Sequence, residues 1–189
     1  MIDINTVSGR ILIGNLLFAA CCITYLIWWS IAFRPGYTAP MMLKGSLFLI
    51  TAALGIAGLA MIIYGCAQTE SPVRYIHVIA AGAAVYVILL VTNVLMHRQV
   101  TTELMLIVFW ACVEISACGA LCGENVFSGR AFVILAIIVL AAATAGMICY
   151  LKYYDLEPMK AFYDGMVPLI LFAVVMIGIS VYQVIRNMN

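Results

Sequence analysis

The chain of 189 residues is 67% hydrophobic and only 9% charged, with a formal net charge of +1. Soluble domains carry roughly 25% charged residues, and the deficit here extends over the whole length, so a soluble domain is excluded. The near-zero net charge also lacks the basic field that nucleic-acid binding requires, and no nucleic-acid partner is expected. Because the apolar runs are continuous rather than alternating, they favour membrane-spanning helices over the strands of a barrel.

Six apolar segments are long enough to cross the hydrocarbon of a lipid bilayer, which takes about 20 helical residues. We therefore predict an all-α integral membrane protein, a single-domain bundle of six transmembrane helices. An even number of spans returns the chain to its starting side, so both termini should lie on one face of the membrane. The predicted spans are 10–33, 41–66, 74–96, 102–122, 130–151 and 165–185.

The connections between the spans contain residues that end or begin helices. The sequence Arg34-Pro35-Gly36 ends the first span, and Ser71-Pro72 supplies an N-cap followed by a proline in the first turn of the third. The longest connection, residues 152–164, combines two lysines with four aromatic residues. This composition predicts a short interfacial helix among the lipid head groups.

An arginine opens every second span, at Arg10, Arg74 and Arg130. Two of these arginines stand in the sequence Ser-Gly-Arg, which indicates three successive two-helix hairpins of similar plan. The alternative is that each arginine simply reaches the head groups from a helix end, as arginines commonly do.

The orientation in the membrane is only weakly marked by charge. We call side A the face of the termini and of the second and fourth connections, and side B the face of the other three. Side A carries four basic residues and side B five, which slightly favours side B in the cytoplasm. This balance also permits insertion in both orientations and an antiparallel homo-oligomer. The expected location is the cytoplasmic membrane of a bacterium or archaeon.

The most informative stretch is the fourth span, which contains Glu114 near its middle. A carboxylate in hydrocarbon is costly unless it is protonated, paired or hydrated, so such a residue usually faces a bundle interior. At 100° per residue, Glu114 shares one stripe of its helix with Glu103, Ile107, Trp110 and Cys118. We expect the other helices to cover this stripe.

Three further polar side chains are predicted in the side A half of the membrane. At a rise of 1.5 Å per residue, Glu114 lies ~12 Å inside its helix end, Asn15 ~7 Å, and His77 and Gln183 ~4–5 Å. These residues, from four different spans, could line one pocket that opens to side A. The candidate cation beside Glu114 is Arg74 or His77, which lie on the same side. The alternative is that each polar group is satisfied separately, at the interface or by a neighbouring backbone.

No metal or cofactor site is predicted. The two histidines, His77 and His97, lie on one span, so a single chain cannot present haem with histidines from two helices. The seven cysteines contain no C-x-x-C motif and are interpreted as small apolar residues. Motifs for phosphate binding and for nucleophilic or zinc-dependent hydrolysis are absent, so an enzyme is the less favoured class.

The predicted function is the binding or translocation of a small solute or ion through a polar intramembrane pocket, with proton coupling as an option. Glu114 would be the proton carrier or ligand, because transporter sites lie where polar groups converge inside the membrane. Two alternatives stay open. One is a non-catalytic subunit or anchor that docks other membrane proteins, with Glu114 paired across the interface. The other is a membrane thiol oxidoreductase using Cys66, Cys118 and Cys122.

Overall fold

The computed structural model describes residues 4–95 and 102–188, and within these ranges the chain forms six long helices, one short 3-10 helix and no strand. Each of the six is long and apolar enough to cross a membrane, which confirms the predicted six-helix bundle. The elements are α1 (Val7–Ala32), α2 (Met41–Ala67), α3 (Pro72–Leu95), α4 (Thr102–Gly123), α5 (Gly129–Lys152), η1 (Tyr153–Asp155) and α6 (Pro158–Met188).

Several helix ends follow directly from local sequence. Thr6 caps α1, because its side-chain oxygen accepts a hydrogen bond of 3.1 Å from the backbone N–H of Gly9. Ser128 caps α5 in the same way through the N–H of Ala131, at 3.2 Å. Pro72 is the first residue of α3, a position where its missing N–H has no cost.

The connection between α5 and α6 differs from the predicted interfacial helix. Only the three residues of η1 form a separate turn, and α6 already begins at Pro158, well ahead of the predicted span. The reason is a contact with the first helix: Trp29 donates a hydrogen bond of 3.1 Å to the backbone oxygen of Phe162 and packs against Gly165. The aromatic segment around Phe162 therefore belongs to the bundle.

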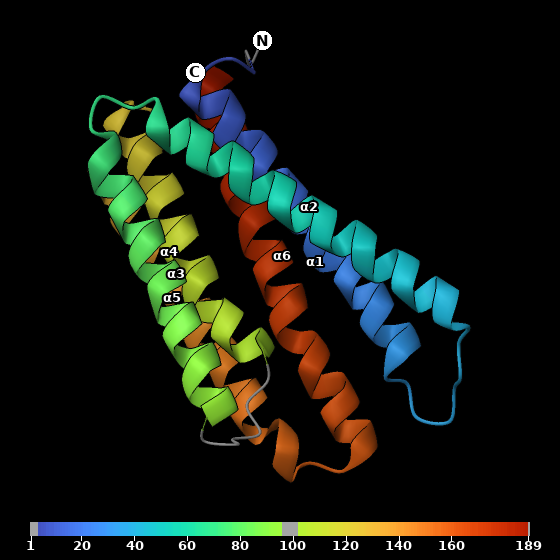
Figure 1. The fold of residues 1–189 in the computed structure, drawn as a ribbon. Helices are drawn as coiled ribbons and strands as arrows, with labels where there is room; N and C mark the ends of the chain where they lie inside the picture. Colours follow the sequence, from blue (N-terminus) through green and yellow to red (C-terminus); the bar gives the residue numbers. More distant parts are fainter. Residues whose placement is uncertain (1–3, 96–101, 189) are drawn as a thin grey trace.

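The helices are close together at side A and diverge toward side B (Figure 1). The hairpin of α1 and α2 forms one arm, α3, α4 and α5 form the other, and α6 packs against both α1 and α5. Both chain ends lie at the side where the arms meet, as the even number of spans predicts. Within their most apolar windows, 56% of α4 and 44% of α6 are buried, against 11–22% of the other helices. The two central helices are therefore α4 and α6.

The pairs α1–α2, α3–α4 and α5–α6 all pack together, in agreement with successive hairpins. Two further pairs, α1–α6 and α4–α5, pack to a similar degree, whereas α2 and α3 touch only slightly. The bundle is thus a chain of neighbouring helices that stays open along the seam between α2 and α3.

Glycines bring α1 and α2 into close contact. A Cβ atom added at Gly14 would lie 2.5 Å from Ile62 Cγ1 and 2.9 Å from the backbone oxygen of Gly58, so no side chain fits there. A Cβ at Gly58 would in turn approach the ring and backbone of Phe18 at 3.1–3.2 Å. Small residues of this kind let helix backbones approach in lipid, where packing replaces the hydrophobic effect as the driving force.

Candidate intramembrane site

Glu114 is completely buried at the centre of the bundle, with 0% of its surface exposed. Its helix places the predicted stripe inward: Ile107 and Cys118 are buried with it, and Trp110 is half-buried. The side chain of Glu103 lies outside the described residues. The prediction that other helices cover this stripe is therefore confirmed for the rest of its length.

Neither carboxyl oxygen of Glu114 has a hydrogen-bond partner among the described residues. Its ionisable neighbours are two thiols, Cys22 on α1 and Cys118 one turn further along α4, which are close enough to interact with it electrostatically. The only ion pair between described residues joins Lys160 and Glu157 at the surface. Buried polar groups without partners are rare in proteins, and each one points to an ion, a water molecule or a ligand.

Two more buried polar side chains have unsatisfied atoms. Asn15 on α1 is 0% exposed, and both its amide nitrogen and its amide oxygen have no partner among the described residues. Gln183 on α6 is also 0% exposed; its nitrogen donates hydrogen bonds to the backbone oxygen of Ser8 at 2.6 Å and to Ser8 Oγ at 2.9 Å, but its oxygen is left unpaired.

The contacts between helices place Asn15 and Glu114 within about one helix turn of each other in depth. Gln183 on α6 is bonded to Ser8 on α1, and the two helices run in opposite directions. Asn15 follows Ser8 on α1 by the same number of residues as Met176 precedes Gln183 on α6. Asn15 and Met176 therefore lie at the same depth. Trp110 Nε1 donates to the sulfur of Met176 at 3.4 Å, and Glu114 follows Trp110 by one turn, or ~6 Å, toward side A. The polar site therefore occupies the packed, side A half of the bundle.

The structure does not bring Arg74 or His77 to Glu114. Both side chains are exposed on α3, and neither forms an ion pair or hydrogen bond with the carboxyl group. The physical reason is the rotation of α3, whose face toward α4 is set by Tyr75 against Gly119 and by Gly82 against Cys112. Residue 77 lies about 200° round the helix from residue 75, so it points away.

A different arginine lies near the side A end of the site. Arg10 is half-buried, one of its terminal nitrogens has no partner among the described residues, and its guanidinium stacks over the ring of Tyr64 at 4.1 Å. From the sequence, Arg10 was one of the three arginines that could reach the head groups from a helix end. It lies more than one turn closer to the helix end than Asn15.

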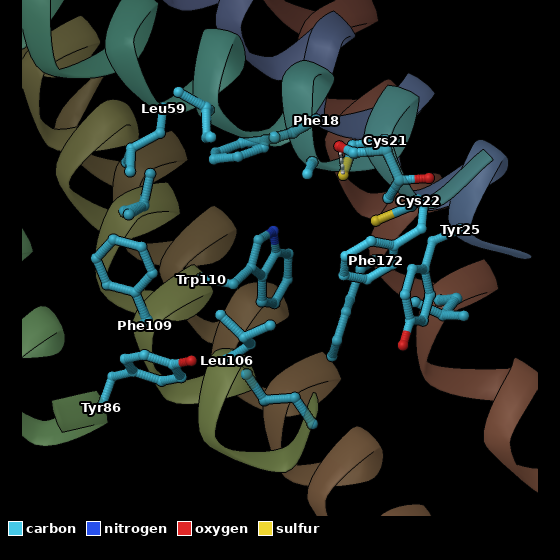
Figure 2. A pocket seen from close by; sticks show the side chains of 18 of the residues that line it. Phe18, Cys21, Cys22, Tyr25, Leu59, Tyr86, Leu106, Phe109, Trp110 and Phe172 are labelled. Atoms are coloured by element: carbon cyan, nitrogen blue, oxygen red, sulfur yellow. Dashed lines mark hydrogen bonds between the residues drawn. The ribbon is translucent and has the colours of Figure 1, made fainter. Parts of the chain in front are cut away.

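A partly enclosed cavity of about 540 Å³ lies between the two arms of the bundle (Figure 2). It is lined by residues of every helix, mostly aliphatic and aromatic, and no charged residue contributes to the lining. Figure 2 shows Phe18, Cys22 and Tyr25 on one side facing Phe109 and Trp110 on the other. Its size falls within the range of small-molecule sites, roughly 300–1,000 Å³.

Trp110 connects the cavity to the polar site. Its indole stacks on Phe172 with ring centres 4.2 Å apart, which holds the ring at the cavity wall. Glu114 lies one turn beyond Trp110 on the same helix stripe, and its neighbour Cys22 also lines the cavity. Glu114 does not itself line the cavity, but it follows the lining residues Trp110 and Val113 on α4, so it lies just beyond the cavity wall toward side A.

This cavity could not be predicted from the sequence, because helix crossing angles decide where side chains leave space. Most of its aromatic lining was indistinguishable from residues that face lipid. One available signal was the spacing of Phe18, Cys21, Cys22 and Tyr25, which places four adaptable side chains along one face of α1.

The structure offers no assembled metal site within the described residues: no three histidine, cysteine or carboxylate side chains come together there. His97 lies outside those residues. All seven cysteines are free thiols, Cys66, Cys118 and Cys122 among them.

Comparison with known proteins identifies no relative, since no protein-family model, curated protein or solved structure matches the chain.

Proposed function

We propose that the protein binds a small solute inside the membrane and moves it across, with Glu114 as the group that exchanges a proton. The observation that carries this proposal is the fully buried carboxyl group of Glu114, which has no partner among the described residues and lies beside a cavity. Intramembrane carboxyl groups are expensive to maintain, and those that persist commonly serve ion or proton pathways.

The site residues divide into two roles in this proposal. Glu114 carries the proton or meets the solute, while the unpaired oxygens of Asn15 and Gln183 supply neutral acceptors on two other helices. When the carboxyl group is protonated it is neutral and tolerates its apolar surroundings. When it is ionised it needs a positive partner, and the solute can provide one. Arg74 and His77 have no part in this site.

The complete burial of Glu114 also bears on the alternative of a docking subunit. A carboxyl group covered by its own chain has no surface with which to pair across an interface. The exposed faces of the helices leave association with other membrane proteins open, but Glu114 does not serve it in this conformation.

A pH-jump measurement on proteoliposomes tests the proposal. The protein is adsorbed with its liposomes on a solid-supported membrane, and the external buffer is switched between two pH values without any solute. We expect a transient current from proton binding inside the membrane, which Glu114→Gln abolishes while the far-UV circular dichroism spectrum stays unchanged. An equal current in Glu114→Gln, or none in the parent protein, would refute the proposal.

A further inference from the structure

We infer that the solute is a lipophilic cation, with an apolar body in the cavity and its positive charge directed toward Glu114. This inference rests on the proposed function and names its substrate class. It follows from three independent properties of the cavity: the aromatic lining, the absence of positive charge and the position of the opening.

The first property is the density of aromatic rings. Eight aromatic side chains line the cavity, and every one of the six long helices contributes at least one: Phe18, Tyr25, Phe48, Tyr86, Phe109, Trp110, Tyr150 and Phe172. The faces of aromatic rings carry partial negative charge and attract cations, most strongly where water is excluded. An anion in the same place would meet the same faces with repulsion.

The second property is the sign of the polar groups. No lysine, arginine or histidine lines the cavity. On the side A side of the cavity the unpaired buried atoms include four acceptors, both carboxyl oxygens of Glu114 and the amide oxygens of Asn15 and Gln183, and two donors, the amide nitrogen of Asn15 and one terminal nitrogen of Arg10, which lies nearer the helix end. Acceptor oxygens stabilise a positive charge, and the carboxylate would neutralise it. No ion pair among the described residues involves Glu114, so a cationic ligand would supply the counter-charge that its ionised form lacks.

The third property is the location of the rim. The most exposed lining residues are Ile56 at 71%, Phe48 at 49% and Leu106 at 46%, on α2 and α4. The helix α2 touches both α3 and α4 only slightly, so the cavity opens between α2 and these two helices, toward the region that lipid occupies. An apolar body can enter by this route without leaving hydrocarbon, whereas a hydrophilic ion cannot.

A pair of probes with the same shape and opposite charge tests the inference. Tetraphenylphosphonium and tetraphenylborate are titrated by isothermal calorimetry into the full chain in lipid nanodiscs, with empty nanodiscs subtracted for lipid partitioning. We expect saturable binding of the phosphonium that is at least tenfold weaker in Glu114→Gln, is retained in Glu114→Asp and is lost in Ala52→Phe, which fills the cavity from α2. Tetraphenylborate should show no saturable binding to the parent protein.

Comparable binding of both probes to the parent protein would overturn the inference, and so would an unchanged phosphonium affinity in Glu114→Gln. The probe comparison needs only the parent protein, so it decides the matter even if a variant fails to fold. The pH-jump current separates the two proposals. A current that depends on Glu114 without phosphonium binding would reject the substrate class alone. Absence of the current from the parent protein, or an equal current in Glu114→Gln, would reject the proposed function.

Discussion

The two halves of this bundle are built from the same six helices in opposite ways. On side A the helices are tightly packed, with Gly14 and Gly58 in backbone contact, Gln183 bonded to Ser8, and Phe127 against Tyr182 at 5.1 Å. Toward side B the two arms diverge and leave a cavity lined by large aromatic residues. The polar site is buried in the packed half, and its Glu114 lies one helix turn beyond Trp110, which lines the cavity.

The difference shows how packing and function are separated along one set of helices. Glycines and short polar side chains bring backbones together, which supplies the contacts that stabilise helices in lipid. Bulky rings on the same helices hold them apart and line a space that ligands can enter. Three buried polar side chains with unsatisfied atoms lie in the packed half, where they lower the stability of the protein. The open half provides access to them.

The largest effect should come from a side chain inserted into the packed half. Gly14→Leu places a branched chain where even a Cβ atom would lie 2.5 Å from Ile62 Cγ1, so the free energy of unfolding should fall by about 3 kcal/mol or the protein should fail to fold. Thermal and chemical unfolding in detergent measure this change. The matched control is Gly178→Ala, which meets open space and should gain about 0.5–1 kcal/mol. Equal effects at the two glycines would show that the α1–α2 contact is not tight.

The next largest effect concerns the tie between α1 and α6 on side B. Trp29→Phe removes the hydrogen bond of 3.1 Å to the buried oxygen of Phe162, and leaving that oxygen unsatisfied should cost ~2 kcal/mol. Chemical unfolding measures it, with Trp28→Phe as the control because the neighbouring ring is half-exposed. If both variants unfold at the same denaturant concentration, the Trp29 hydrogen bond does not hold α1 to α6.

A smaller loss is expected at the junction of the chain ends. Ser8 Oγ accepts hydrogen bonds of 2.9 Å from both Gln183 and Asn187, so Ser8→Ala should lower the free energy of unfolding by ~1 kcal/mol. Ser46→Ala is the control, since that exposed hydroxyl bonds only to the backbone oxygen of Met42 in its own helix among its described contacts. A loss at Ser8 no greater than at Ser46 would argue against the junction.

The smallest effect on stability should come from the most polar position. Because Glu114 has no partner among the described residues, Glu114→Leu leaves no charge or hydrogen-bonding group stranded and should unfold at the same temperature as the parent protein or higher. The same variant should lose the pH-jump current. A clear drop in stability would reveal a partner that the carboxyl group needs.

The sequence was sufficient to predict the six helices, the common side of the termini and the burial of Glu114. Long apolar runs determine the membrane spans. A carboxyl group in the middle of a span avoids lipid by facing the interior of the bundle. Depth alone was a poorer guide to the site. Asn15 and Gln183 lie inside, but His77 faces outward because α3 turns Tyr75 and Ile79 toward α4.

The remaining features depend on packing between distant segments. The first turns of α6 join the bundle because Trp29 reaches Phe162, a contact that local composition cannot reveal. The cavity depends on the angle between the two arms, which glycines such as Gly14 and rings such as Trp110 determine together. Neither the angle nor the orientation of each helix follows from periodicity, since every face of a helix in lipid can be apolar.

The central claim is that Glu114 takes up and releases a proton inside the membrane, and infrared difference spectroscopy tests it most directly. Spectra of the protein in lipid are recorded before and after a change of buffer pH. The account predicts a carboxylic acid C=O band that disappears as the group ionises, that shifts when the lipophilic phosphonium is bound, and that is missing from Glu114→Gln. A spectrum without a titrating band, or one in which Glu114→Gln retains the band, would contradict the account.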